Sequence, residues 1–409
     1  IAQTDFPVAL GHRIPQPDMV SDYFKGCLWA FSLSISIFLF PISAKHKFWL
    51  SLAWAIKVFI ALGFMLIYEN HYGLDAYSYF RNAKTGIFSL SNFSFGLGTH
   101  NLTNLARFQN QFIPDSYHAL KISCAFIGLL AIYLFYRAAV MYLEGRDNDK
   151  LFFVLALFPG VLFWSTILGK DPIVLFGIAI YSLGAVGWQK KRRLLYLVLI
   201  CLGIAIAAFI RVWLAPILVA PLAVYVFLGI KNYAVKILFL VFVALLFLVS
   251  MDRFAEKFQV ETVQEVVQTT EKVSQGWARG GSGQSREGDI KSVGDMLKFA
   301  PIGMVTALFR PFPGEVLNLF GLLASLENLV LLYLLALSIK RFKKEDLKDP
   351  VLLWAIVLVL TWSFVYGFVS FQNLGSAVRF KLQVLPVLIC VLLLLSRKRE
   401  HRTLAVLKR

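Results

Sequence analysis

The chain has 409 residues, of which 58% are hydrophobic and 16% charged, whereas soluble domains average about 45–50% and about 25%. A soluble globular protein is therefore excluded, and several apolar runs are long enough to cross a bilayer. The net charge of +17 does not indicate nucleic-acid binding, because basic residues collect in the cytoplasmic loops of membrane proteins. The glycine motifs of nucleotide-binding proteins and the paired histidines of zinc sites do not occur.

The apolar runs predict an all-α, polytopic integral membrane protein with about eleven transmembrane helices. The predicted spans lie near residues 26–43, 48–68, 119–143, 151–168, 172–188, 194–212, 214–230, 234–251, 317–338, 350–370 and 382–396. Residues 1–22 precede them as a polar tail, 23–396 form the transmembrane domain, and 397–409 form a basic tail.

The distribution of charge predicts the orientation of these spans. About half of the 41 basic residues lie in short loops and in the C-terminal tail, including the runs 190–193 and 340–348. The positive-inside rule places these segments and the C-terminus in the cytoplasm. The N-terminal tail and two large loops, about 69–118 and 252–316, are then extracytoplasmic. Within the second loop, an amphipathic helix around 263–270 precedes a glycine-rich segment, 276–288, that is expected to be flexible.

Charged residues gather at the predicted outer ends of the spans, and the first of them is Asp75. A carboxylate at a span end can take a proton from an acceptor hydroxyl, since hydrocarbon on one side raises its basicity while water admits the substrate. The alternative is that Asp75 is a solvated loop acid beside interfacial tyrosines such as Tyr77 and Tyr79.

A tight link between two apolar runs, 163–172, carries Lys170 and Asp171. Lys170 can bind an anionic headgroup, although ordinary lipid phosphate would equally explain its position. Asp171 is expected to cap the following helix, with Pro172 at the first helical position.

Arginine suits phosphate because its planar guanidinium donates two parallel hydrogen bonds. Arg211 ends a span, where snorkelling is the alternative interpretation, and Arg379 precedes the last span. Arg310 and Glu315 lie in the segment TALFRPFPGE. Its two prolines predict non-helical backbone near the membrane, which has to be buried in protein or to line a wet cavity.

Four ionisable residues fall within the predicted spans and are functional candidates by default, namely Lys57, Lys121, Arg137 and Glu327. Lys121 and Arg137 lie near span ends, where we expect them to snorkel. These four residues do not form a proton-relay chain, and Glu327 is the one good candidate for the mid-membrane acidic residue that a transporter would need.

Four segments carry a resemblance to a known family: GLDAYSY after an early span, the FWSTILGKD link, LFRPFPGE, and NLGSAVR before the last span. The chain resembles the GT-C class of membrane glycosyltransferases, which depend on polyprenyl-phosphate-linked sugars. It is also similar to membrane proteins of bacterial exopolysaccharide and O-antigen clusters. It departs from the GT-C pattern in having two predicted spans before the first outer loop and no large soluble C-terminal domain.

The resemblance implies a glycosyltransferase of the bacterial inner membrane that moves a sugar from a lipid-linked donor to a glycan or protein acceptor. Asp75 would be the catalytic base. Lys170, Arg211, Arg310 and Arg379 would hold the donor phosphate, with Asp171 and Glu315 completing the substrate-binding set. No cofactor is implied, and a divalent metal is optional. The implied partners are the donor, the acceptor, membrane lipids and proteins of an envelope assembly, without nucleic acid.

Three alternatives remain open. An O-antigen or capsule polymerase or ligase would use the same arginines without needing Asp75 as a base. A transporter would require acidic groups such as Glu327 at mid-membrane. A non-catalytic subunit of an envelope assembly would use the N-terminal tail and the amphipathic helix as binding elements.

Overall fold

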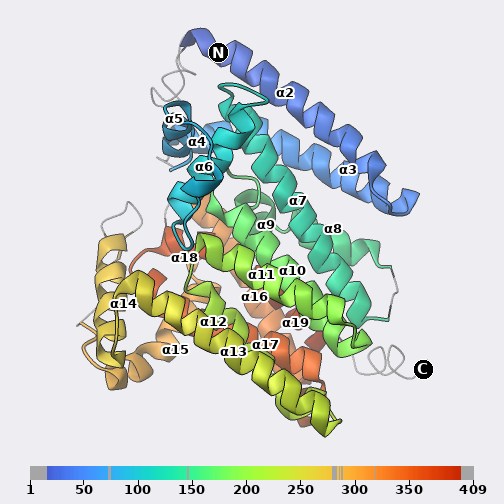
Figure 1. The fold of residues 1–409 in the computed structure, drawn as a ribbon, viewed down its shortest axis with the longest axis vertical. Helices are drawn as coiled ribbons and strands as arrows, with labels where there is room; N and C mark the ends of the chain where they lie inside the picture. Colours follow the sequence, from blue (N-terminus) through green and yellow to red (C-terminus); the bar gives the residue numbers. More distant parts are fainter. Residues whose placement is uncertain are drawn as a thin grey trace. The chain divides into compact units, whose positions relative to one another are not determined.

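The computed structural model describes residues 16–71, 75–144, 147–278, 283–284, 286, 289–316 and 318–397 (Figure 1). Most of these residues are helical, and the β-structure among them is one isolated antiparallel bridge between Gly283 and Asn373. The prediction of a helical protein is confirmed. Most of the predicted flexible segment 276–288 and of the two tails lies outside the described residues.

Six helical segments of the described chain are long and apolar enough to cross a membrane, so the protein is a multi-pass membrane protein. They are Ala44–Glu69, Tyr117–Tyr142, Lys170–Lys191, Tyr233–Phe258, Leu319–Arg341 and Pro350–Ser370. Each overlaps one of the eleven predicted spans. A seventh span is present if Leu374–Lys381 and Leu385–Leu395, which meet at a bend of 71°, are counted together.

The remaining predicted spans are shorter, interrupted or less apolar. The run 151–168 forms two helices, α8 (Asp149–Leu157) and α9 (Pro159–Trp164), because Pro159 starts a new helix where the first one ends. The run 214–230 is divided among α-helical, 3₁₀ and π-helical turns. Helix α2 (Gln16–Leu39) is long enough to span but less apolar than the six, and it begins inside the predicted tail.

The described chain divides into two compact units. Unit 1 comprises residues 1–137, 147–182 and 201–211, and unit 2 comprises residues 138–146, 183–200 and 212–409. The division passes through three helices, α7 (Tyr117–Tyr142), α10 (Lys170–Lys191) and α11 (Leu194–Ile210).

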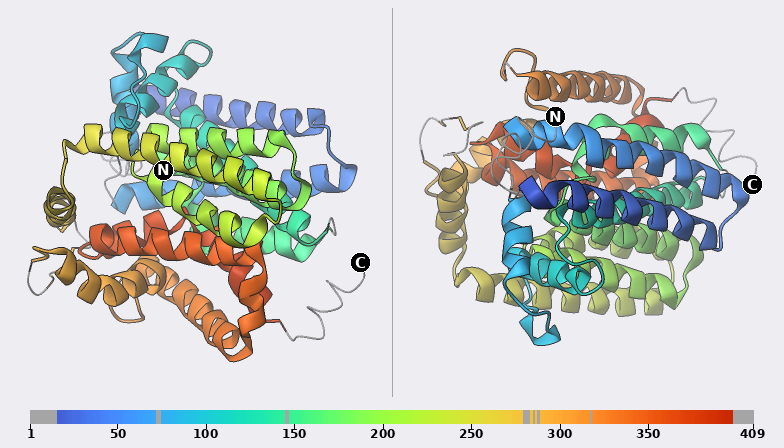
Figure 2. Two further views of the ribbon diagram at one scale, coloured as in Figure 1. Left: turned by 60° about the horizontal axis from the view of Figure 1, so that its bottom comes forward. Right: turned by 90° about the horizontal axis from the view of Figure 1, so that it is seen from above.

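Unit 1 holds the N-terminal helices and the first predicted outer loop. Besides α2, α8, α9 and its parts of α7, α10 and α11, it contains α3 (Ala44–Phe59), η1 (Ile60–Phe64), α4 (Met65–His71), α5 (Ala76–Lys84), η2 (Leu90–Asn92) and α6 (Gly98–Asn110). Helices α2 and α3 run side by side (Figures 1 and 2). The short helices α5 and α6 pack on each other and form the structured part of the loop.

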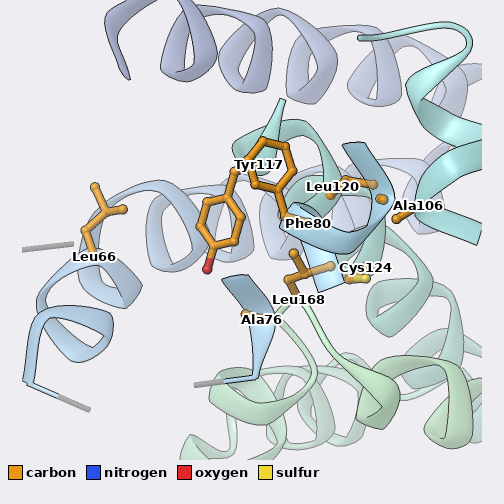
Figure 3. Packing of buried hydrophobic residues seen from close by; sticks show 9 residues of the cluster. Leu66, Ala76, Phe80, Ala106, Tyr117, Leu120, Cys124 and Leu168 are labelled. Atoms are coloured by element: carbon orange, nitrogen blue, oxygen red, sulfur yellow. The ribbon is translucent and has the colours of Figure 1, made fainter. Parts of the chain in front are cut away.

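A cluster of buried side chains fixes α5 in unit 1 (Figure 3). It draws on α4, α5, α6, α7 and the link before α10, and consists of Leu66, Ala76, Phe80, Ala83, Ala106, Tyr117, Leu120, Cys124 and Leu168. Because the apolar residues of α5 lie in this cluster, the start of α5 and the start of α10 are held by one core.

Unit 2 holds the second predicted outer loop and the C-terminal helices. Its elements are α12 (Leu214–Val219), η3 (Ala220–Leu222), η4 (Tyr225–Gly229), α13 (Tyr233–Phe258), α14 (Val263–Trp277), α15 (Val293–Phe309), α16 (Leu319–Arg341), η5 (Lys344–Lys348), α17 (Pro350–Ser370), α18 (Leu374–Lys381) and α19 (Leu385–Leu395). Helices α15 and α17 form the most extensive helix pair of the unit. They touch at Gly303 and Gly367, where a Cβ atom on Gly367 would lie 2.6 Å from the Gly303 carbonyl carbon.

A second close approach, in unit 1, places Gly128 of α7 against the link between α9 and α10. A Cβ atom at Gly128 would lie 2.0 Å from the Ser165 carbonyl oxygen. Gly128→Ala should therefore push the link away and lower the free energy of unfolding by about 1–3 kcal/mol, as overpacking does elsewhere. Unfolding by SDS in mild detergent micelles measures this. Gly63→Ala is the control, since a Cβ there meets only a Phe59 ring edge at 3.9 Å. An equal loss in both variants would contradict the prediction.

Candidate functional site

Helix α5 presents Asp75 at its N-terminal end. The helix buries one stripe at i, i+3, i+4 and i+7 spacing, made of Ala76, Tyr79, Phe80 and Ala83. Asp75 is exposed, and its carbonyl oxygen accepts hydrogen bonds from Tyr79 N at 3.2 Å and Ser78 Oγ at 2.6 Å. Among the described residues its carboxylate has no hydrogen-bond or ion-pair partner. A carboxylate in this setting is available to a substrate.

Lys170 lies beside the same helix. Its Nζ is 5.8 Å from the centroid of the Tyr79 ring, a cation–π distance, and its side chain is half-buried. Tyr79 is one helical turn after Asp75, so unit 1 brings a carboxylate and an ammonium group from positions 95 residues apart to the same short helix. Lys170 is also the first residue of α10, where a cation opposes the helix dipole and an anion would be favoured.

The buried Lys57 of α3 holds the non-helical link that precedes α10. Its Nζ donates to Ser165 Oγ at 2.5 Å, to Thr166 Oγ1 at 3.0 Å and to the Ser165 carbonyl at 3.3 Å. All three residues are fully or almost fully buried. Three oxygen acceptors replace the water that the ammonium group has lost, and in exchange they fix the backbone just before Lys170.

Asp171 and Arg211 form a buried ion pair. The distance from Arg211 Nη2 to Asp171 Oδ1 is 2.9 Å, and the two side chains are 6% and 0% exposed. The expectation that Asp171 caps α10 is wrong by one position, since the helix begins at Lys170 and Asp171 is its second residue. Arg211 does not snorkel, because its partner lies inside the protein. The pair ties the end of α11 to the start of α10.

A second buried ion pair was not foreseen. Lys121 Nζ lies 2.9 Å from Glu69 Oε2, and Tyr117 OH donates to Glu69 Oε1 at 2.9 Å. Lys121 is completely buried, so the expectation that it snorkels is wrong. Arg137, by contrast, is exposed. The contacts of Glu69 with Lys121 and Tyr117 fasten the end of α4 to α7. Glu69 precedes Asp75 by six residues.

In unit 2, Arg310 follows the last residue of α15, where the prolines end the helix as predicted. Its Nη2 lies 2.7 Å from Glu315 Oε1, and its Nε donates to both Glu315 oxygens at 2.9 and 3.0 Å. Partial burial raises the pKa of the Glu315 carboxyl, but hydrogen bonds from Arg310 and from Phe312 N–H outweigh it, so the pKa lies below its usual value. Arg310 Nη2 also donates to Gln284 Oε1 at 3.1 Å.

The backbone after Arg310 is held by a buried polar group on α16. Asn328 Nδ2 donates to the Pro311 carbonyl at 3.0 Å, and Lys381 of α18 donates to Asn328 Oδ1. Lys381 Nζ lies 3.1 Å from Glu327 Oε1, and both side chains are almost fully buried. Glu327 is therefore paired with a lysine, which weakens its case as a proton-coupling group of a transporter.

The predicted site residues thus fall into two sets. Asp75, Lys170, Asp171 and Arg211 belong to unit 1, whereas Arg310, Glu315 and Arg379 belong to unit 2. Arg379 is half-buried on α18, two residues before Lys381. No group of three or more histidine, cysteine, aspartate or glutamate side chains suited to a metal ion occurs in the described part of the chain.

Sequence reasoning missed the partners of these residues. Ser165 and Thr166 had no signal of their own, and Glu69 lay at a span end with no basic residue within two turns. The available signal was the presence of Lys57 and Lys121 in apolar runs, because a buried ammonium group requires acceptors. Which acceptors meet it depends on helix packing.

The Glu69 pair yields a stability prediction. Lys121→Met leaves a carboxylate buried without its cation, so it should lower the free energy of unfolding by about 3–5 kcal/mol. Lys84→Met is the matched control, because Lys84 pairs with Asp115 at 3.7 Å on the surface. Lys84→Met should lower the free energy of unfolding by less than about 1 kcal/mol. SDS unfolding in micelles compares them, and a Lys121→Met protein as stable as Lys84→Met would refute the buried pair.

Comparisons with known proteins add no relative: no protein-family model, no curated protein and no solved structure matches this chain. The family resemblance therefore rests on the four sequence segments alone, and the activity has to be argued from the residues of the site.

Proposed function

We propose that the protein is a membrane glycosyltransferase that moves a sugar from a polyprenyl-phosphate-linked donor to an acceptor glycan or protein. The observation that carries the proposal is the exposed carboxylate of Asp75, which has no partner among the described residues, on the helix whose Tyr79 ring lies under Lys170. A base and a cation are the two groups that this reaction requires of a protein without a metal.

In the proposed reaction, Asp75 removes the proton of the acceptor hydroxyl as its oxygen attacks the anomeric carbon of the donor sugar. The bond from that carbon to the lipid phosphate breaks, and the phosphate leaves with the electron pair. Lys170 and the N-terminus of α10 favour the negative charge that develops on the leaving group. The buried groups of Lys57 and Glu69 position these residues without touching the substrate.

The arginines have different parts in this proposal. Arg211 is 5% exposed and bound to Asp171, so we assign it a positioning role at the start of α10. Arg310 has a side chain that is 19% exposed and has N–H groups in addition to those bound by Glu315. Arg310 and Arg379 remain the candidates for binding a phosphate within unit 2.

A second candidate is a polymerase or ligase of lipid-linked glycans. The hydrogen bond from Arg310 to Gln284 favours it, because it places a phosphate-binding group next to a polar amide without any involvement of Asp75. The two candidates differ in whether a base at position 75 is essential.

We further propose that the protein lies in the bacterial inner membrane with its C-terminus and the runs 190–193 and 340–348 in the cytoplasm. The eleven-span arrangement, with Asp75 and Arg310 in outer loops, belongs to the same proposal. The charge asymmetry of the loops supports it.

The orientation is tested with cysteines at two exposed positions, Gln268→Cys on α14 and Lys344→Cys in η5. A Cys27→Ser background is used, because Cys27 is exposed. A membrane-impermeant maleimide added to spheroplasts should label Gln268→Cys and leave Lys344→Cys unlabelled until the membrane is permeabilised. Labelling of Lys344→Cys in intact spheroplasts would overturn the orientation.

The mechanism is tested with Asp75→Asn, which keeps the shape and removes the base. Glycan formation by membranes from cells that lack the unsubstituted protein should fall about 10²–10⁴-fold, the usual contribution of general base catalysis. Asp115→Asn is the control, since Asp115 is an exposed acid of the same predicted loop. Arg310→Ala should weaken donor binding as well as glycan formation. Full activity of Asp75→Asn, together with loss in Arg310→Ala and Arg379→Ala, would exclude the transferase and favour the polymerase.

A further inference from the structure

Unit 2 contains an apolar groove that none of the residues assigned above lines. Its volume is about 540 Å³, and its lining side chains lie within residues 301–309 of α15, 335–342 of α16, 356–360 of α17 and 388–395 of α19. The volume is within the range of about 300–1,000 Å³ that small-molecule sites have. All four helices belong to unit 2, so the groove lies within one compact unit.

The groove lies where α15 ends against the other helices. Helix α15 touches α17 at Gly303 and Gly367, and the backbone that follows it turns toward α16, where Asn328 Nδ2 donates to the Pro311 carbonyl. The lining residues of α17, 356–360, precede Gly367 by seven to eleven positions, which is about 10–16 Å along the helix. The groove is therefore bounded by the last turns of α15 and by the ends of α16 and α17 that η5 joins.

The walls of the groove are apolar. Ser338 is the one polar side chain of the described lining, and its hydroxyl already donates to the carbonyl oxygens of Leu334 at 2.7 Å and Leu392 at 3.1 Å. A hydrophilic ligand would lose its hydrogen bonds to water at such walls and gain none in return. The groove therefore suits a hydrocarbon chain.

The groove opens toward the surroundings of the membrane-crossing helices. Its lining residues Val305, Ile339 and Leu360 come from three helices and are 46%, 69% and 47% exposed. Because α16 and α17 are two of the six candidate spans, lipid chains of the bilayer can reach this opening from the side. One lipid tail is as apolar as another, so selection among lipids has to come from the headgroup.

Basic residues stand at the end of the groove. On α16 the lining residue Ile339 is followed directly by Lys340, and on α19 the lining residue Leu395 is followed two positions later by Arg397. Arg341 donates to the Ser396 carbonyl, which joins the two helix ends. Lys340 and Arg397 are exposed, and neither has an ion-pair partner among the described residues.

The sign of the charge at this end is positive in both segments that form it. Residues 340–349 contain five basic and three acidic side chains, and residues 397–409 contain six basic and one acidic. Residues 398–409 lie outside the described part of the chain, but their own excess of basic residues has the same sign wherever they lie. Basic residues beside an opening between membrane helices favour an anionic headgroup.

We propose that this groove binds one anionic phospholipid of the bilayer. An acyl chain lies between α15 and α16, and the phosphate lies at Lys340 and Arg397. The apolar walls and the basic end match the two parts of such a molecule. The inference does not depend on the proposed transfer reaction, and a lipid in this position would support the last turns of α15, which Arg310 follows.

The chain-binding part is tested by native mass spectrometry of the full chain in detergent, titrated with phosphatidylglycerol or phosphatidylcholine of equal chain length. One phosphatidylglycerol should bind at least about 10-fold more tightly than phosphatidylcholine. Val305→Trp and Leu360→Trp each fill the groove from an exposed position and should abolish this tight site. Leu326→Trp is the control, because Leu326 is 51% exposed on α16 and does not line the groove.

The headgroup part is tested with the double variant Lys340→Gln/Arg397→Gln. It should weaken phosphatidylglycerol binding about 10–30-fold, as expected for two basic groups, and leave phosphatidylcholine binding unchanged. Lys257→Gln/Lys272→Gln removes two exposed lysines of α13 and α14 and should change neither. Size-exclusion chromatography and circular dichroism identify any variant that fails to fold, and the two groove-filling variants on different helices serve in place of each other.

Four results would overturn the inference. They are equal affinity for the two phospholipids, equal effects of the groove-filling and control tryptophans, tighter binding of a polyprenyl phosphate than of phosphatidylglycerol at the site that Val305→Trp abolishes, and lipid binding that appears only when the chain is truncated after Arg397. The third result would assign the groove to the proposed donor, and the fourth would assign it to residues 398–409.

Discussion

A charged side chain inside an apolar protein has no water around it, so it must meet an opposite charge or several hydrogen-bonding groups. The positions of Asp171 and Arg211, and of the segments that precede Asp75 and Lys170, depend on this requirement. Lys57 satisfies it with two hydroxyls and a carbonyl of the link before α10. Glu69 satisfies it with Lys121 and Tyr117, and Asp171 with Arg211. Each contact joins segments far apart in the chain, and together they hold irregular backbone at sites where a membrane protein would otherwise continue as helix.

The same requirement separates residues that hold the structure from residues that can act on a substrate. A buried, paired arginine such as Arg211 has fixed geometry and little access to a ligand. Asp75 and Lys170 differ from it, since Asp75 is exposed and Lys170 is half-buried against an aromatic ring. In the proposed reaction the buried pairs supply order and the accessible groups supply the base and the charge. This division explains why one short helix can be both firmly packed and chemically available.

In unit 2, a partly exposed arginine lies beside a polar amide. Arg310 is bound by Glu315 on one side and donates to Gln284 on the other. Gln284 is one of the described residues that line a polar pocket, and a guanidinium suits an anion. In the proposed function that anion would be the phosphate of the lipid-linked donor, and a transferase or a polymerase would use the arginine in the same way.

Hydropathy alone determined that the protein is helical and crosses the membrane several times, and it located six of the spans, such as 350–370, with ends at most seven residues from those of the helices. This succeeds because a bilayer demands about twenty apolar residues and internally satisfied backbone, and both are visible in a single segment. Proline likewise predicted the end of α15 before Arg310. Tertiary structure alone decided that Lys121 pairs with Glu69, that Arg211 pairs with Asp171, and that the Gln284 backbone N–H donates to the Gln372 carbonyl. These partners are 40 to 88 positions apart, and a buried charge or amide specifies only that a partner must exist. The packing of the helices determines which one it is.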